Sequence, residues 1–434
     1  MPPRRPVVLS AGLAAVLGLA ACSGGGGGQD PAADGGSSGP VTLTMTFWGS
    51  EDRATRYTEA LDLFESEHPD ITVNETFAAW ADYWPARATE AAGRALPDVI
   101  QSDVSYLQEY GGQGSFLDLA PYLEDGTIDL EGWDEKLVEA GTVDGRQVGI
   151  PTSTNTLAIF LNPDVAAAAG VPLPTGDLTW DDLHAFITEV SASGATTAEG
   201  QPLYGGPDTG ANFEYFTLWM VQNGDGPFAE DGSPLFDEAD IVEFLERTAD
   251  LRASGSVFPA ARATALAPKT GFGANEQAAD FTWDNFLAQH TNDSGKTNLE
   301  MMPVPVADDG ERHMFWKPSM LLSAGGNTEH PAEAAVLIDF LLTDPRVGEI
   351  FGTSKGVPAD PEQRDAVVTE EGSIDAKVLA YEEAVADEVT ADTPVYPEGI
   401  GTLTQTWTKL AEELNYGNIT PEDFAAQFFA ELQL

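Results

Sequence analysis

The hydrophobic pattern of the chain becomes regular at Val41, after an irregular N-terminal stretch. Residues 41–47 alternate apolar and polar side chains, which predicts a strand. The elements predicted next are a helix with Tyr57 and Phe64 on its buried face, ended by His68-Pro69, a strand at 71–77, a helix at 81–93 and a short buried strand at 97–101. This rhythm predicts an α/β fold with a parallel, doubly wound sheet and right-handed crossovers. Ligand sites of such sheets lie beyond the carboxyl ends of the strands, here at 48–52 and 102–106.

The rest of the pattern predicts a second unit that is mainly helical. Strands at 148–151 and 156–161 are expected to cross between two lobes. Thr179 followed by Asp182 is typical of a capped helix start, because each side chain can bond the backbone N–H of the other residue. The remaining predicted elements are helices at 164–170, 213–223, 238–253 and 403–414 and after Pro331 and Thr420, and strands at 298–306 and 314–323.

The first 40 residues have the build of an export signal followed by a linker. Two arginines precede an apolar run at 7–21, which is too short for a spanning helix of about 20 apolar residues. The run ends in Leu19-Ala20-Ala21-Cys22, which resembles the lipobox of bacterial lipoproteins, whose cysteine becomes the lipid-modified first residue. We therefore expect a signal peptide at 1–21 and a lipid-anchored, flexible linker at 22–40, on the outer face of the cytoplasmic membrane. The alternative is an ordinary signal peptide in which Cys22 is incidental.

Composition narrows the class of protein. The 434 residues carry 20 Lys and Arg against 71 Asp and Glu, a formal net charge of −51. Such a surface repels phosphate backbones, so nucleic-acid binding is excluded, and solubility outside the cell explains the charge better than an acidic binding site does. Cys22 is the single cysteine, which excludes a disulfide framework and a thiolate metal site. The length predicts two domains.

Short segments in a characteristic order and spacing run through nearly the whole mature chain. They are Phe47-Trp48-Gly49, His68-Pro69-Asp70-Ile71, Leu96-Pro97-Asp98-Val99-Ile100, Gly149-Ile150-Pro151, Ala169-Gly170-Val171-Pro172, Thr179-Trp180-Asp181-Asp182-Leu183, His330-Pro331-Ala332-Glu333, Gly356-Val357-Pro358 and Tyr416-Gly417-Asn418-Ile419-Thr420-Pro421-Glu422. Together they resemble the extracellular solute-binding proteins of bacterial ABC importers, in the sugar-binding, maltose-binding-protein-like family.

The resemblance implies a two-lobe periplasmic-binding-protein-like fold of type II, with the ligand cleft between lobes joined by crossing hinge segments. The first lobe is expected at 41–150 plus 275–325, and the second at 151–274 plus 326–434. A ligand that contacts both lobes only in the closed form shifts the population toward that form. The implied protein is a monomeric lipoprotein without enzymatic activity or cofactor, which captures a saccharide and delivers it to the permease subunits of the importer.

A saccharide site needs flat aromatic rings for the C–H faces of the sugar and charged or amide groups for its hydroxyls. Trp48 stands at the predicted end of a strand, Asp103 follows another, and Trp283 lies in the region that matches the family's ligand-contacting tryptophan. The candidate ligand-binding residues are Trp48, Glu51, Asp52, Arg53, Trp80, Tyr83, Asp103, Glu214, Tyr215, Trp219, Trp283, Asp284, Asn285, Trp316 and Lys317. In the competing interpretation, the aromatic members fill lobe cores and Asp103 caps a helix.

Two other functions stay open at this point. One is a secreted acidic glycoside hydrolase that uses two carboxylates, which turnover of a glycoside would reveal. The other keeps the fold but binds a peptide, a polyamine or an iron chelate. The five histidines are scattered without metal-ligand spacing, and the sequence contains no Gly-x-Ser-x-Gly elbow or P-loop motif. The sequence therefore predicts neither a metal site nor those catalytic sites.

Overall fold

The computed structural model describes residues 39–432, apart from Ser50, Asp225, Glu230, Pro268 and Glu398. Cys22 and the predicted signal peptide lie outside the described residues. The helices and strands lie between Val41 and Leu432, within the unit Pro40–Leu434. In the part of the chain that the structure describes, no helix is long and apolar enough to cross a membrane.

A six-stranded mixed sheet forms the centre of the first lobe, with the strand order β11-β6-β10-β3-β1-β2. β1 (Val41–Trp48) pairs in parallel with β2 (Ile71–Ala78) and with β3 (Val99–Ser102). The connecting helices are α1 (Glu51–Glu67) and α2 (Trp80–Ala92), so the predicted parallel alternation of strand and helix is confirmed here. The antiparallel strands that complete the sheet are β6 (Ile150–Asn155), β10 (Lys317–Ala324) and β11 (Val357–Pro358).

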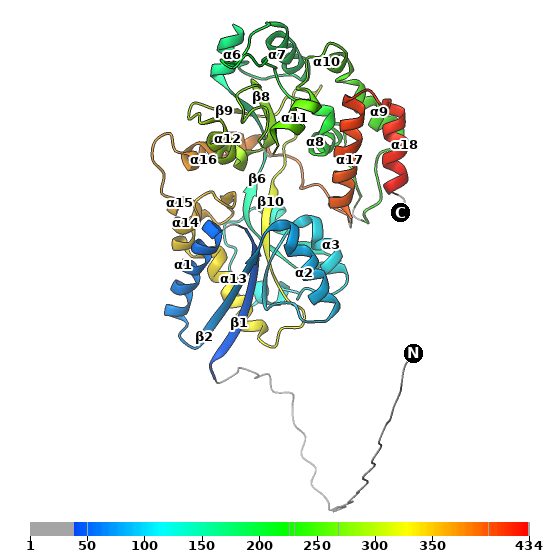
Figure 1. Cartoon of the computed structure of the whole chain (residues 1–434). Helices are drawn as coiled ribbons and strands as arrows, with labels where there is room; N and C mark the ends of the chain where they lie inside the picture. The colour runs from blue at the N-terminus through cyan, green and yellow to red at the C-terminus, as the bar shows by residue number, and fades with distance from the viewer. Residues whose placement is uncertain are drawn as a thin grey trace, which may run out of the picture. The chain divides into compact units, whose positions relative to one another are not determined.

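Helices cover both faces of this sheet. On one face α1 lies with α13 (Pro331–Thr343) and α14 (Pro345–Phe351), and on the other α2 lies with α3 (Val104–Gly112) (Figure 1). Side chains alternate along β1, so Leu43 and Phe47 point into the α1 core and Trp48 into the α2–α3 core. The shorter elements of this lobe are α4 (Ala120–Glu124), α5 (Glu135–Glu139), β4 (Thr142–Val143), β5 (Arg146–Gln147) and α15 (Pro361–Ala366).

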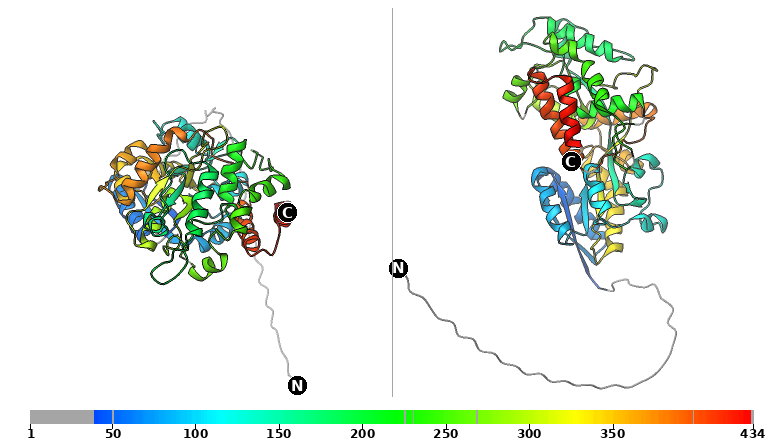
Figure 2. Two further views of the ribbon diagram at one scale, coloured as in Figure 1. Left: turned by 90° about the horizontal axis from the view of Figure 1, so that it is seen from above. Right: turned by 90° about the vertical axis from the view of Figure 1, so that its right-hand side faces the viewer.

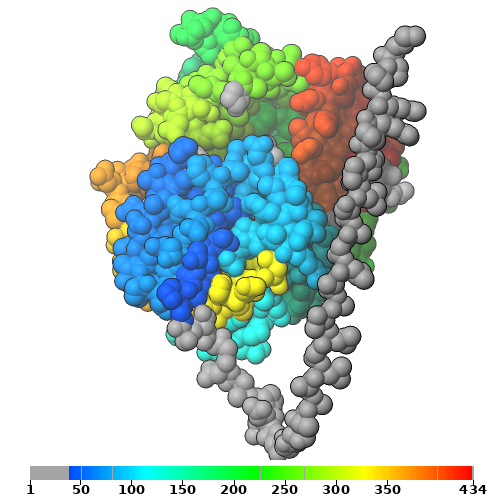
Figure 3. Space-filling model, turned by 60° about the horizontal axis from the view of Figure 1, so that its bottom comes forward, coloured from blue at the N-terminus to red at the C-terminus, as the bar shows by residue number. Residues whose placement is uncertain are grey.

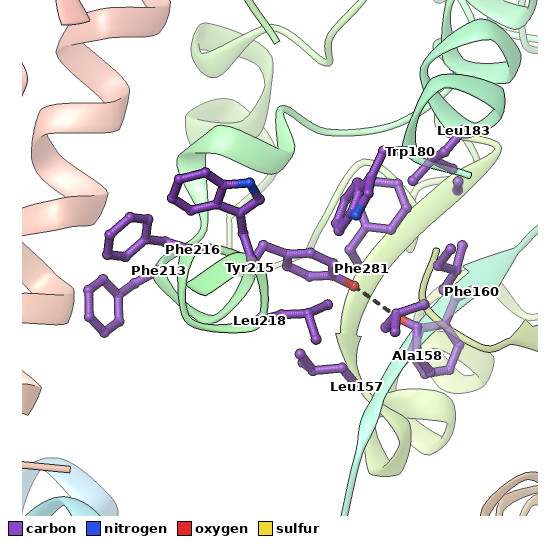
Figure 4. Close-up of a cluster of buried hydrophobic side chains, with 14 of the residues drawn as sticks. Leu157, Ala158, Phe160, Trp180, Leu183, Phe213, Tyr215, Phe216, Leu218 and Phe281 are labelled. Carbon is purple, nitrogen blue, oxygen red and sulfur yellow. Dashed lines mark hydrogen bonds between the residues drawn. The ribbon is translucent and has the colours of Figure 1, made fainter. Parts of the chain in front are cut away.

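The second lobe is built around a three-stranded antiparallel sheet with the order β8-β7-β9. Its strands are β7 (Leu157–Leu161), β8 (Ala279–Trp283) and β9 (Glu300–Met302). Its helices are α6 (Pro163–Ala169), α7 (Trp180–Ala192), α8 (Phe213–Asn223), α9 (Glu238–Glu246), α10 (Ala249–Ala253), α11 (Ala260–Leu266), α12 (Leu287–Ser294), α16 (Ile374–Val385), α17 (Ile400–Asn415) and α18 (Pro421–Leu432), with short 3-10 turns η1 (Thr209–Ala211), η2 (Asp284–Phe286) and η3 (Ala386–Glu388). Aromatic side chains such as Phe160, Phe216 and Phe281 fill its core (Figure 4).

The chain passes between the two lobes at three places. These are the junction of β6 with β7, the segment before β10, and the segment between α15 and α16. Figure 1 shows β6 and β10 running between the two groups of elements, and the right-hand view of Figure 2 shows the red C-terminal helices beside the green elements of the second lobe. The structure therefore has the expected two-lobe α/β architecture.

The strand pairings allocate two segments differently from the expected division of the chain. That division places 275–325 in the first lobe and 326–434 wholly in the second. In the structure β8 and β9 pair with β7 of the second lobe, and α13 and α14 pack in the first-lobe core against β1 and α1. Figure 3 shows the yellow segment around α13 flanked by blue and cyan residues from the N-terminal third. The difference arises because the chain returns to the six-stranded sheet only at β10.

Candidate functional site

Five aromatic side chains gather beyond the end of β1, and we call them the aromatic cluster: Trp48, Trp80, Tyr83, Trp84 and Tyr106. The ring of Trp48 packs edge-on against Trp80, with centroids 4.9 Å apart, and Trp84 stacks on Tyr106 at 3.8 Å. Trp80 is 44% exposed, whereas Trp48 is 9% exposed. Trp80 therefore supplies the open surface of the cluster, which suits the C–H face of a sugar ring.

The charged residues at the start of α1 have two different placements. Glu51 and Asp52 are exposed, and Asp52 pairs at 2.9 Å with an arginine one helical turn on. Arg53 donates from Nη1 to the carbonyl of Trp48 at 3.3 Å and from Nη2 to that of Ser354 at 3.2 Å. The Arg53 guanidinium thus ties the end of β1 to the loop before β11, while Glu51 and Asp52 face solvent.

Asp103 follows β3 and begins α3. Its Oδ1 accepts a hydrogen bond from the backbone N–H of Ser105 at 2.9 Å, so it is the N-cap of the helix, and its side chain is buried. Burial raises the pKa of the Tyr106 hydroxyl, and the Asp103 carboxylate raises it further. Asp103 therefore combines the helix-cap role of the competing interpretation with a position beside the aromatic cluster.

Glu214 brings a second carboxylate to this region from the other lobe. It lies in the first turn of α8, and its Oε2 atom is buried without a hydrogen-bond partner among the described residues. Burial raises the pKa of the Glu214 carboxyl, the Lys317 ammonium lowers it, and the Asp103 carboxylate raises it. Glu214 is therefore an electrostatic neighbour of both Asp103 and Lys317, although the three residues come from different lobes and from the strand that joins them.

Trp283 and Lys317 meet where β8 ends and β10 begins. The ammonium nitrogen of Lys317 lies 5.2 Å from the centroid of the Trp283 ring, which is within cation–π range. Asn155, at the end of β6, pairs with Lys317 in the six-stranded sheet, so this corner adjoins the junction between the lobes. Trp283 and Lys317 are both partly exposed, which leaves them accessible to a ligand.

Tyr396 completes this group, although the sequence did not single it out. It lies between Pro394 and Pro397, and its ring packs against hydrophobic cores of both lobes. Its hydroxyl is buried without a hydrogen-bond partner in the described part of the chain. Burial raises the pKa of Tyr396, as do the carboxylates of Glu214 and Asp103. The available sequence signal was weak: an aromatic residue between prolines in a stretch without periodicity.

A groove of about 850 Å³ lies between elements of the two lobes. Its first wall comes from α3, α5 and the β4–β5 hairpin, and its second from the end of α8 and residues 390–396. Tyr396 lines it, as does Val104, the neighbour of Asp103, whereas Asp103 itself, Glu214, Trp283 and Lys317 do not. Its volume is in the range of small-molecule sites, roughly 300–1,000 Å³. We call Asp103, Glu214, Trp283, Lys317 and Tyr396 together the interlobe site.

Three of the candidate aromatic residues fill lobe cores, as the competing interpretation expects. Tyr83 and Tyr215 are fully buried. The Tyr83 hydroxyl donates to the carbonyl of Gln101 at 2.8 Å, and the Tyr215 hydroxyl donates to that of Ala158 at 3.4 Å, a bond drawn in Figure 4. Trp219 is buried in the second lobe among other aromatic rings. Because these side chains already have polar or apolar partners in the interior, they belong to the lobe cores that underlie the site.

The last three candidates lie around the junction of the lobes. Asp284 is completely buried and bonds the backbone N–H of Thr156 at 3.2 Å, so its carboxyl faces the interior. Asn285 is partly exposed, and its Oδ1 atom is buried without a partner among the described residues. Trp316 packs against the cores of both lobes. Asn285 is thus the member of this trio with unused hydrogen-bonding capacity.

Comparison with known proteins assigns the family. The sequence model of the bacterial extracellular solute-binding proteins matches residues 59–377. The chain belongs to this family. Among the relatives of this solute-binding protein, the maltodextrin-binding protein MdxE of Bacillus subtilis is 24% identical over 92% of this chain and 89% of its own length. An arabinooligosaccharide-binding protein of the same organism is 25% identical over 52% of this chain and 50% of its own length.

Solved structures share the fold of this solute-binding protein. A periplasmic oligogalacturonide binding protein from Yersinia enterocolitica superposes with a TM-score of 0.72 at 23% identity, covering 90% of this chain and 98% of its own. The relatives named here are binding proteins rather than enzymes. Among the residues that the structure describes, no group of three or more His, Cys, Asp or Glu is placed to hold a metal ion.

Proposed function

We propose that this solute-binding protein captures an oligosaccharide in the interlobe site and delivers it to the permease of an ABC importer. The observation that carries the proposal is the buried Glu214 Oε2 atom of the second lobe, which has no hydrogen-bond partner among the described residues and lies within electrostatic range of Asp103 of the first lobe and Lys317 of the strand between them. A ligand that touches all three gains its full contacts only when the lobes are closed, so its binding energy favours the closed form.

The chemistry of the site fits a sugar. Hydroxyl groups donate to carboxylates and accept from an ammonium, and hydrogen bonds to charged groups contribute about 1.5–3 kcal/mol each. Glu214 Oε2 and the Tyr396 hydroxyl are buried polar atoms without partners among the described residues, and ligand hydroxyls would satisfy them. Trp80 in the aromatic cluster and Trp283 in the interlobe site both offer exposed ring surface. The ligands in the names of the relatives, maltodextrin and arabinooligosaccharide, support this class.

The membrane attachment of the protein is also a proposal. Lipid modification of Cys22 would tether the binding unit to the outer face of the cytoplasmic membrane, and two or more acyl chains are needed for firm anchoring. The test is to label growing cells with a fatty-acid analogue and to compare the wild type with Cys22→Ser. We expect label and membrane retention only for the wild type. Equal retention of the serine variant would contradict the anchor.

Calorimetric titration tests the capture function. The chain from Pro40 onward, which contains every described element, is titrated with malto-, arabino- and galacturono-oligosaccharides and with the constituent monosaccharides. Tryptophan fluorescence is followed in parallel, and the recovered sugar is analysed for cleavage. We expect saturable one-site binding of an uncleaved oligosaccharide. Cleavage would favour the glycoside hydrolase, and binding only of a peptide, polyamine or iron chelate would overturn the sugar assignment.

A further inference from the structure

Two buried carboxyl groups from separate elements meet beside the junction of the lobes. Asp284 follows β8 and is 0% exposed, and Glu382 lies on α16 and is 5% exposed. Each changes the pKa of the other, so they are direct neighbours. A pair of carboxyl groups in a protein interior is expensive if both are charged, because burial strengthens the repulsion between them and removes their hydration. The oligosaccharide binding proposed above does not use either group.

Each carboxyl group holds one side of the junction at Asn155. The Glu382 Oε2 atom accepts a hydrogen bond at 2.7 Å from the hydroxyl of Thr154, which belongs to β6 of the first lobe. Asp284 Oδ2 accepts from the backbone N–H of Thr156 at 3.2 Å, and the Asp284 N–H donates to the Thr156 carbonyl at 3.0 Å. Thr156 immediately precedes β7 of the second lobe. The pair therefore spans the first crossing between the lobes.

The same crossing is tied to the second one and to the interlobe site. The Thr156 hydroxyl donates to the carbonyl of Phe315 at 3.1 Å, just before β10 begins. Asp284 lies between Trp283 and Asn285 in the sequence, and Lys317 pairs with Asn155. Contacts that hold Asp284 and Asn155 in place therefore also hold their neighbours Trp283 and Lys317 in place.

Burial raises the pKa of Asp284 and of Glu382, and the Asp284 carboxylate raises the pKa of Glu382 further. Asp284 accepts hydrogen bonds from two backbone N–H groups, those of Thr156 and Asn285, which favour its charged form. Glu382 is therefore the member of the pair on which we place the shared proton. Its Oε1 atom is buried and has no hydrogen-bond partner among the described residues, so it is free to donate to Asp284 when protonated. The other titratable groups on the elements around the pair are Tyr381 on α16, Arg364 on α15, Arg312 before β10, Tyr215 on α8, and His290 on α12, which lies against Asp280.

We propose that Asp284 and Glu382 are a positioning pair that shares one proton, locks the crossing at Asn155 and thereby holds Trp283 and Lys317 in place for the ligand. Loss of the shared proton leaves two neighbouring charges in the interior. The crossing then loosens, the protein loses stability, and the site loses affinity.

Thermal unfolding without ligand is the first test. Between the ordinary carboxyl pKa and the raised one, the folded state holds a proton that the unfolded state has released, so stability falls as pH rises through that window. Glu382→Gln keeps a donor toward Asp284 at every pH and cannot titrate. We expect the melting temperature of the wild type, taken relative to that of Glu382→Gln at the same pH, to fall between pH 5 and pH 9. Glu383→Gln, an exposed neighbour on the same helix, should follow the wild type. Parallel profiles of wild type and Glu382→Gln would overturn the proposal.

Ligand affinity measured against pH is the second test, and only this readout rests on the proposed function. We expect affinity to fall at high pH in the wild type, to vary less with pH in Glu382→Gln, and to be weak at every pH in Glu382→Ala, which lacks the donor. Equal pH profiles for the wild type and both variants would contradict the positioning role. If no sugar binds the wild type, the capture function fails, and the ligand-free unfolding profiles still decide the pair.

Discussion

The ammonium nitrogen of Lys317 lies 5.2 Å from the centre of the Trp283 ring, where the edge strand β8 of the second-lobe sheet ends and β10, the strand that returns to the first lobe, begins. The same ammonium lowers the pKa of Glu214. The Lys317 ammonium therefore links the ring of Trp283 to the carboxylate of Glu214, two residues that lie 69 positions apart in the sequence. This corner is the most specific feature of the interlobe site.

Trp283→Ala should weaken oligosaccharide binding by about tenfold or more, because it removes ring surface and a cation–π contact of roughly 0.5–2 kcal/mol. Calorimetric titration of the variant measures the change. The matched control is Tyr416→Ala, which removes an aromatic ring that is 51% exposed and does not belong to the interlobe site. An affinity of Trp283→Ala equal to that of the control would contradict the assignment.

Substitutions at Asp103 should distinguish its role as the N-cap of α3 from the role of its charge in ligand binding. Asp103→Ala removes the acceptor for the Ser105 N–H and should destabilise the protein by about 1 kcal/mol, whereas Asp103→Asn keeps an N-cap oxygen and should stay near wild-type stability. Both variants lose the carboxylate, so both should bind the sugar more weakly. Urea unfolding and titration report the two effects. Full recovery of affinity in Asp103→Asn would mean that Asp103 acts through the helix cap alone.

Lys355 should make stability depend on pH above neutrality. Its ammonium is buried 3.7 Å from the centroid of the Phe351 ring, and burial, followed by the charge of Arg53, lowers its pKa to about 7. Between pH 7 and about 10 the unfolded chain holds a proton that the folded protein has lost, so stability rises with pH by at most about 1.4 kcal/mol per unit. Lys355→Met should abolish this rise in the melting temperature, and Lys409→Met, an exposed control, should retain it. A rise that persists in Lys355→Met would show that another group causes it.

His290 and Asp280 should change the stability of the protein with pH in opposite directions, so that their contributions nearly cancel in the wild type. His290 Nε2 lies 3.4 Å from Asp280 Oδ2, and burial lowers the pKa of His290 to about 4 and raises that of Asp280 to about 6. The stability that neutral His290 contributes is lost as pH falls from about 6.5 to 4, because the unfolded chain binds that proton more readily than the folded protein. The stability that protonated Asp280 contributes is lost as pH rises from about 4 to 6, because the unfolded chain releases that proton more readily.

The two single variants should therefore show slopes of opposite sign. His290→Gln leaves only the aspartate, so its stability should fall from pH 4 to 6, by at most about 1.4 kcal/mol per unit. Asp280→Asn leaves only the histidine, so its stability should rise over the same window. Denaturant unfolding at closely spaced pH values measures both slopes. Slopes of the same sign would contradict the opposite pKa shifts of His290 and Asp280.

Local patterns in the sequence predicted local structure well. Thr179 and Asp182 form the expected capping box, with each side chain accepting the other's backbone N–H at 3.1 Å. The alternation at 41–47 became β1, which pairs in parallel with β2 from Val41 opposite Ile71 to Trp48 opposite Ala78. These features depend on neighbours a few residues away, or on the period of a strand, and both can be read from the chain.

Features that depend on distant partners were harder to predict. The helix expected at 238–253 breaks into α9 and α10, because Thr248 leaves the helical conformation and Arg252 donates to the Leu245 carbonyl at 2.6 Å. Lobe membership of 275–325 depends on strand pairing with β7, which no local pattern reveals.

The site shows the same division. Strand ends and the resemblance suggest Asp103 and Trp283 as site residues, and their role in binding stays a prediction. Helix α8 is apolar on nearly every face, so periodicity could not separate Glu214 from the buried Tyr215 and Trp219. Tyr396 was missed because its role comes only from packing against both lobes.

The most direct test of the account is titration of one oligosaccharide into three proteins side by side: the wild type, Asp103→Asn and Glu214→Gln. One substitution removes a charge from the first lobe and the other from the second. If the ligand is held between the lobes, both variants bind it at least about tenfold more weakly than the wild type, since each loses a hydrogen bond to a charged group. Weaker binding in only one variant would place the sugar on a single lobe, and unchanged binding in both would contradict the interlobe site.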